Sequence, residues 1–118
     1  MTLCEFYAAV GGSYTDAMGR LQSEAFLTKF LRMLPQDGSM ALLADALARG
    51  SAGDAFRAVH TLKGIALNLS LTSLAGACSD MTEALRGRDA MPENTPALYD
   101  AVVQAYGVVT ETLKQLEA

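Results

Sequence analysis

Residues 51–69 read SAGDAFRAVHTLKGIALNL, and this stretch predicts one long amphipathic helix. Ser51 and Asp54 stand three residues apart, a spacing that resembles a capping box at the start of a helix. Apolar residues then recur every three or four positions, which places them on one side of the helix, facing a core. These residues are Phe56, Val59, Leu62, Ala66 and Leu69.

A neighbouring strip of the same helix lies about 100° away from this apolar stripe and is expected at the edge of solvent. It carries His60, Lys63, Gly64 and Leu67, and His60 is the single histidine of the chain. Residues three and four apart share a helix surface, so the imidazole, the ammonium and a patch of bare backbone are expected together.

This grouping has the chemistry that a transferable phosphoryl group needs. A neutral imidazole nitrogen is a nucleophile near neutral pH, and Lys63 can offset the charge of an acquired phosphoryl group. Gly64 costs about 1 kcal/mol in a helix relative to alanine, so it predicts either room for a partner or close packing of another helix. Arg57 can add charge to the strip, or it is simply an exposed residue without a partner.

The remaining sequence also has helical spacing almost throughout, with no run of alternating strand residues. A short helix over residues 3–10 is expected to stop at Gly11-Gly12. Ser13 and Asp16 then predict the start of a long helix that Pro35 ends. A third helix is expected to close at Gly50.

Two further helices follow the central one in the prediction. A break at residues 70–73 precedes an apolar pattern that runs out at Gly87, and a polar linker spans residues 88–94. Thr95 as N-cap and Pro96 as first helical residue then predict the last helix.

We therefore expect an all-α fold: an up-down antiparallel four-helix bundle with one or two short accessory N-terminal helices. The chain of 118 residues is expected to form a single domain, residues 1–118, with one core. The side chains expected in that core include Phe30, Val59, Met81 and Val109.

Composition excludes several classes of function. A net charge of -4 and a pI near 4.8 argue against nucleic acid or an anionic membrane as partner. No apolar run of about 18 residues and no signal segment is found, so a cytoplasmic protein is expected. Cys4 and Cys78 are expected to be two reduced thiols. We predict no bound metal and no other cofactor. Asp80 and Glu83 are expected to be solvated surface.

The decapeptide Ala55-Phe-Arg-Ala-Val-His-Thr-Leu-Lys-Gly64 resembles the signature of histidine-containing phosphotransfer (Hpt) domains. The resemblance continues through Asn68-Leu69, Leu74 and the segment MTEALR at residues 81–86, and it reaches from about Phe6 to Leu116.

The resemblance implies that His60 accepts a phosphoryl group from the aspartate of one response-regulator receiver domain and passes it to another. Lys63 would stabilise that group, and Gly64 would admit the active-site loop of the partner. It further implies a monomer without kinase activity of its own, whose partners are receiver domains and a sensor or hybrid histidine kinase. Magnesium is expected only on the receiver.

Two positions depart from the family pattern. Leu67 stands where a small residue is common, so it can narrow the docking surface or tune which receiver binds. Ser70 stands where glycine is common, and it is expected to affect only how the helix ends or to cap the next one. Two other functions stay open: a non-phosphorylated helical adaptor that binds receiver or kinase domains, and an enzyme with a concave pocket.

Overall fold

The computed structural model describes residues 1–116, which fold into helices and turns without a strand. In chain order the elements are α1 (Leu3–Val10), α2 (Tyr14–Leu21), α3 (Glu24–Met33), the 3-10 turn η1 (Leu34–Gln36), α4 (Ser39–Arg49), α5 (Ala52–Asn68), α6 (Thr72–Leu85) and α7 (Thr95–Leu113).

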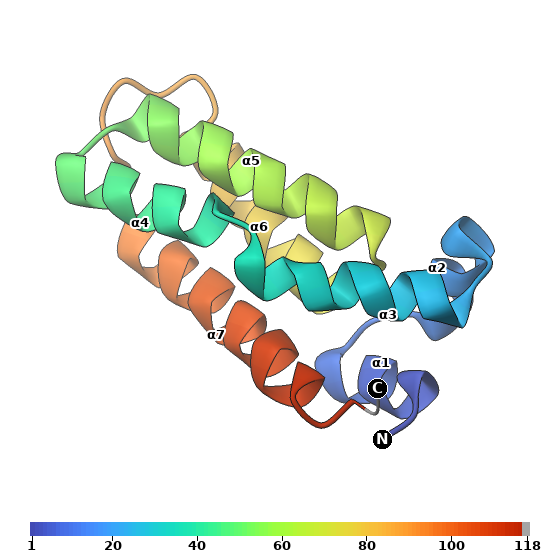
Figure 1. The fold of residues 1–118 in the computed structure, drawn as a ribbon. Coiled ribbons are helices and arrows are strands. Elements are labelled where there is room, and N and C mark those ends of the chain that lie inside the picture. Colours follow the sequence, from blue (N-terminus) through green and yellow to red (C-terminus); the bar gives the residue numbers. More distant parts are fainter. Residues whose placement is uncertain (117–118) are drawn as a thin grey trace.

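The expected all-α bundle is confirmed. Helices α5, α6 and α7 run in alternating directions, while α3 and α4 follow one another in the same direction and together form the fourth position of the bundle (Figure 1). Helix α5 packs between α4 and α6, and α6 packs on α7. The short helices α1 and α2 are accessory, and α1 contacts α7.

Most of the predicted helix ends agree with the structure. Helix α1 covers residues 3–10, and Gly11 ends it with a φ of 68°, a left-handed conformation that glycine adopts without strain. Gly50 ends α4 in the same way. The final helix starts one residue earlier than expected, because Asn94 takes the flanking position and Thr95 is already helical.

The predicted long helix from Ser13 to Pro35 is wrong, because the chain breaks after Leu21. Gln22 adopts a φ of 57° and ends α2, and its amide donates to the Met18 carbonyl at 2.8 Å. The hydroxyl of Ser23 then accepts from the Phe26 amide at 3.2 Å and caps α3. A second serine cap within a continuous apolar pattern therefore produced two helices instead of one.

The core contains three of the four side chains named for it. Val59, Met81 and Val109 are buried, whereas Phe30 is 41% exposed, so its assignment to the core is wrong. Buried Leu27 and Leu31 mark the inner side of α3. Phe30 lies at the edge of that stripe, where it borders a surface hollow instead of an opposing helix.

The N-terminal hairpin of α1 and α2 is attached to the turn between α5 and α6. The Ser13 amide donates to the Ser70 carbonyl at 3.0 Å, and the Ser73 amide donates to the Gly11 carbonyl at 3.0 Å. A Cβ on Gly12 would stand 2.7 Å from the Ser70 carbonyl oxygen, so this close approach requires glycine.

Ser70 does more than end a helix, which corrects the sequence-based expectation. It is buried with a φ of 54°, and its hydroxyl donates to Asp16 on α2 at 2.5 Å. It does not cap α6, which begins after Leu71 without a side-chain cap. Ser70 thus fastens α2 to the end of α5.

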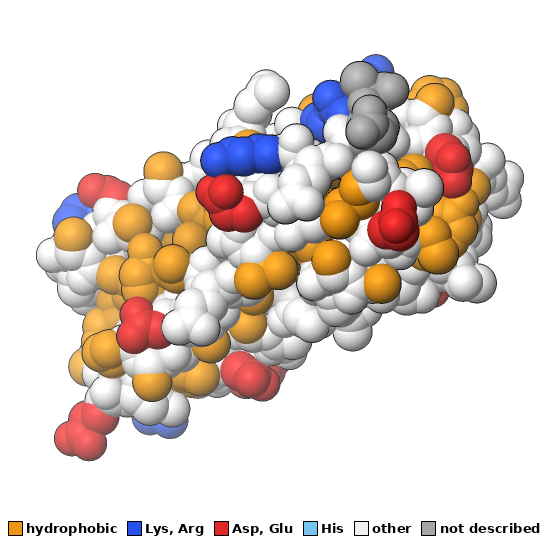
Figure 2. All heavy atoms as spheres, turned by 90° about the horizontal axis from the view of Figure 1, so that it is seen from below, with side chains coloured by type: hydrophobic (Ala, Val, Ile, Leu, Met, Phe, Trp, Pro, Cys, Tyr) orange, Lys and Arg blue, Asp and Glu red, His pale blue; other side chains and the backbone are white. Residues whose placement is uncertain are grey.

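The surface opposite α5 has mixed character. Seen from below, hydrophobic, acidic and uncharged side chains are interspersed, and Lys or Arg side chains are few (Figure 2). Among residues 1–116, no helix combines the length and the apolar character that crossing a membrane requires.

We predict that Tyr7→Phe lowers the free energy of unfolding by about 1–2 kcal/mol. The buried Tyr7 hydroxyl donates to the Leu69 carbonyl at 2.7 Å, where α5 ends, and its removal leaves a buried acceptor without this donor. Urea unfolding measures the loss. Tyr14→Phe is the control, because the Tyr14 hydroxyl bonds Glu24 at an exposed position. Equal losses in the two variants would contradict this account.

Candidate functional site

The site lies on α5, whose start is firmly fixed. The Ser51 hydroxyl accepts from the Asp54 amide at 3.2 Å, which confirms the predicted cap. Arg49 at the end of α4 pairs with Asp54 at 3.0 Å and joins the two helices at their shared turn. Hydrogen bonds from Arg49 and Arg57 hold the pKa of Asp54 below its usual range, so the carboxylate is charged at the positive end of α5.

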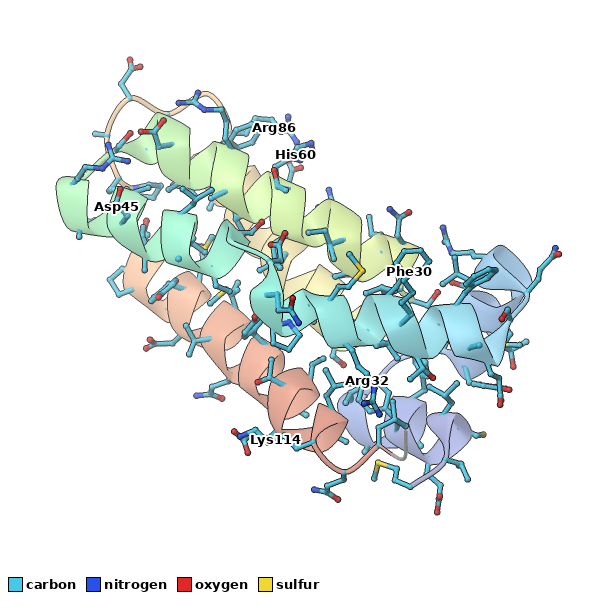
Figure 3. All side chains as sticks on the ribbon, viewed as in Figure 1. Phe30, Arg32, Asp45, His60, Arg86 and Lys114 are labelled. Carbon is cyan, nitrogen blue, oxygen red and sulfur yellow. The ribbon has the colours of Figure 1, made fainter. Side chains whose placement is uncertain are left out.

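Burial of the apolar stripe turns the second strip outward, as the sequence predicted. Val59, Leu62 and Ala66 are buried, while His60, Gly64 and Leu67 are exposed. Lys63 is half-buried, because it lies closer to the stripe than the other three. His60 projects from α5 on the side away from α7, near Arg86 (Figure 3).

Charged groups from two helices meet around His60. Glu83 on α6 accepts two hydrogen bonds from Arg86, at 3.1 and 3.0 Å. These bonds lower the pKa of the Glu83 carboxyl, and its electrostatic interactions with Arg86, Lys63 and the His60 side chain lower it further. The imidazole therefore has both a lysine and a paired carboxylate in its neighbourhood.

The imidazole also has an aromatic neighbour. The rings of Phe56 and His60 are stacked, with centroids 5.7 Å apart and planes 8° from parallel. The guanidinium of Arg86 lies over the Phe56 ring, 5.2 Å from its centroid. Phe56 is half-buried and so belongs both to the edge of the core and to the site.

Gly64 provides an open surface one turn from His60. A Cβ built at Gly64 meets nothing within 4 Å beyond its own helix, so no other helix packs closely there. This observation removes the alternative that Gly64 serves close helix packing. Leu67, on the same strip, is 46% exposed and adds an apolar side chain to this open surface.

Arg57 is not an unpaired exposed residue. Its side chain is 71% exposed and pairs with Asp54 one turn earlier on α5. Its backbone carbonyl accepts from the Thr61 hydroxyl at 2.9 Å.

Two hollows flank the C-terminal half of α5. The larger, of about 720 Å³, lies between α2, α3 and α5, and its apolar lining residues include Phe30, Met33 and Ile65. The smaller, of about 280 Å³, includes Lys63 and Leu67. His60 lines neither of these two hollows.

Sequence reasoning missed two parts of this site. Phe56 was assigned only to the core, although its position four residues before His60 is a spacing that brings helix side chains into contact. Glu83 is solvated surface, as expected, but no local pattern shows that α6 brings it, and Arg86 just after the helix, to α5. Within residues 1–116, no three His, Cys, Asp or Glu side chains gather as metal ligands would.

Comparison with known proteins agrees with this geometry. The family model for the Hpt domain matches residues 25–118, which include α4 to α7, all of α3 except its first residue, and the whole His60 strip. Neither a curated protein nor a solved structure matches the chain.

We predict that Gly64→Ala raises the free energy of unfolding by up to about 1 kcal/mol, because alanine is the better helix former and its Cβ meets open space. Urea unfolding tests this. Gly107→Ala in α7 is the matched control, since its added Cβ also meets nothing within 4 Å. A marked destabilisation by Gly64→Ala alone would show that the helix surface at this position is not open.

Proposed function

Because the chain belongs to the Hpt domain family, whose members are phosphocarrier modules of phosphorelays, we propose that it carries a phosphoryl group on His60 between receiver domains. The observation that supports this most directly is the exposure of its single histidine beside Lys63, with open surface over Gly64.

Phosphoryl transfer requires few catalytic groups from this chain. A lone pair of the neutral imidazole attacks phosphorus, an N–P bond forms, and the bond from phosphorus to the receiver aspartate breaks, which releases a carboxylate. The second receiver reverses these steps. Positioning and charge stabilisation dominate phosphoryl transfer, so an exposed histidine without a pocket is sufficient.

Neighbouring residues take supporting roles in this proposal. Lys63 offsets the negative charge on the transferred group, and Gly64 lets the active-site loop of the receiver approach the helix. Magnesium is supplied by the receiver, and this chain holds no cofactor of its own. Leu67 and Arg57 contact the docked partner at the two ends of the strip.

We further propose that the protein works as a cytoplasmic monomer that receives its phosphoryl group in a pathway begun by a sensor or hybrid histidine kinase. Its two cysteines are free, which suits a reducing compartment: Cys4 is exposed and Cys78 is buried. Burial raises the pKa of the Cys78 thiol to about 12, so this thiol is unreactive at neutral pH.

Transfer from phosphorylated receiver domains in magnesium buffer tests the proposal by intact mass. We expect wild-type protein to gain about 80 Da, the mass of one phosphoryl group, in an acid-labile form, and His60→Gln to gain nothing. Lys63→Met is expected to slow the gain by up to about 10²-fold. Lys29→Met, which changes an exposed lysine on α3, serves as control and should transfer normally.

A mass gain that persists in His60→Gln would refute the assignment of the phosphoryl acceptor. Receivers that bind the wild-type protein without transferring to it would instead favour the non-phosphorylated adaptor.

Replacement of Leu67 tests the docking surface. Leu67→Ala is expected to raise the receiver concentration that gives half-maximal transfer by about 5- to 10-fold, with little change in maximal rate, because a partly buried apolar contact is lost. Leu42→Ala on α4 is the control, since Leu42 is 63% exposed and lies on another helix. A changed maximal rate with unchanged half-saturation would assign Leu67 to the transfer step and not to docking.

A further inference from the structure

The imidazole of His60 is held by a stack of side chains that draws on two helices. Phe56, four residues earlier on α5, lies nearly parallel to His60 with ring centroids 5.7 Å apart. Arg86, which follows the last residue of α6, lies over the Phe56 ring at 5.2 Å. The Arg86 guanidinium donates two hydrogen bonds to the Glu83 carboxylate, at 3.1 and 3.0 Å.

An exposed histidine without such neighbours would sample several rotamers, and only some of them present a ring nitrogen to an approaching receiver. Ring stacking restricts that freedom and is worth a few-fold to tenfold in population. Phe56 itself cannot move freely, because it is half-buried against the core and covered by Arg86. Phe56 can therefore restrict the rotamers of His60, because its own ring has little freedom to move.

The arrangement also gives a role to the Glu83–Arg86 ion pair, which the stability of the bundle does not require. Arg86 and Glu83 are 53% and 58% exposed, and an exposed ion pair of this kind adds little to stability. Its two-point hydrogen bonding does fix the direction of the guanidinium, which a single contact would not. The pair thus gives Arg86 one orientation over Phe56.

We propose that Phe56 is a positioning residue for His60, and that the Glu83–Arg86 pair holds Phe56 in place. This inference rests on the phosphoryl transfer proposed above. Phe56 does not touch the phosphoryl group in this scheme. It raises the fraction of time during which the imidazole is oriented for attack, and it does so before any receiver binds.

The test begins with solution NMR, because the single histidine of the chain gives one set of imidazole proton resonances. In the stack these protons lie close to an aromatic ring, whose ring current displaces their resonances. We expect Phe56→Leu to return them toward free histidine and Phe56→Tyr to leave them displaced. Arg86→Gln, an exposed substitution that keeps the core intact, should shift them part of the way.

Kinetics with one receiver then measures the consequence. Phe56→Leu is expected to lower the maximal rate of phosphoryl transfer about 2- to 10-fold without changing the half-saturating receiver concentration, the factor that one stacked aromatic pair supplies. Phe56→Tyr should restore the rate. Phe26→Leu, at a phenylalanine that is 57% exposed on α3, is the matched control and should leave both quantities unchanged.

Each outcome has a defined meaning. Unchanged imidazole resonances in Phe56→Leu would show that the stack does not exist in solution and would overturn the inference. A full transfer rate in that variant, or a loss that Phe56→Tyr fails to rescue, would overturn it as well. If Phe56→Leu unfolds, the resonances and rate of Arg86→Gln decide the question. Failure of wild-type protein to accept a phosphoryl group on His60 would instead refute the proposed function.

Discussion

The arrangement of the site depends on the burial of one apolar stripe on α5. Val59, Leu62 and Ala66 are almost completely buried between the neighbouring helices, so α5 cannot rotate about its axis without exposing them. Since side chains of a helix have fixed angular positions, this burial also determines which residues face solvent. The exposure of His60 is thus a consequence of core packing, and it requires no contact made by the histidine itself.

The surface around His60 is organised for access more than for enclosure. Gly64 leaves open space, the two nearby hollows lie further along α5, and the imidazole borders neither of them. The charged groups near His60 are nevertheless placed in a defined way. Lys63 lies beside the histidine, and the carboxylate of Glu83 is paired with Arg86. Such a surface is consistent with the phosphoryl transfer proposed for His60, because positioning and charge stabilisation dominate that chemistry.

Helices α1 and α2 precede the residues matched to the family, yet they are closely joined to the bundle. Ser70 provides the link: its carbonyl accepts from the Ser13 amide, and its hydroxyl donates to Asp16. The departure of this position from glycine therefore gains a structural reason, because glycine has no side chain that could bond Asp16 on α2. The same contact places α2 beside the hollow that contains Lys63 and Leu67.

The sequence by itself determined the helical class, most helix ends and the outward face of His60, because these depend on local periodicity and capping within single segments. It did not reveal the break at Gln22, where a local serine cap competes with a continuous apolar pattern. Only the tertiary structure decided that Arg86 lies over Phe56 beside His60 and that Phe30 stays exposed. Both depend on how separate helices are placed against one another, and such distances in space leave no periodic signal in the chain.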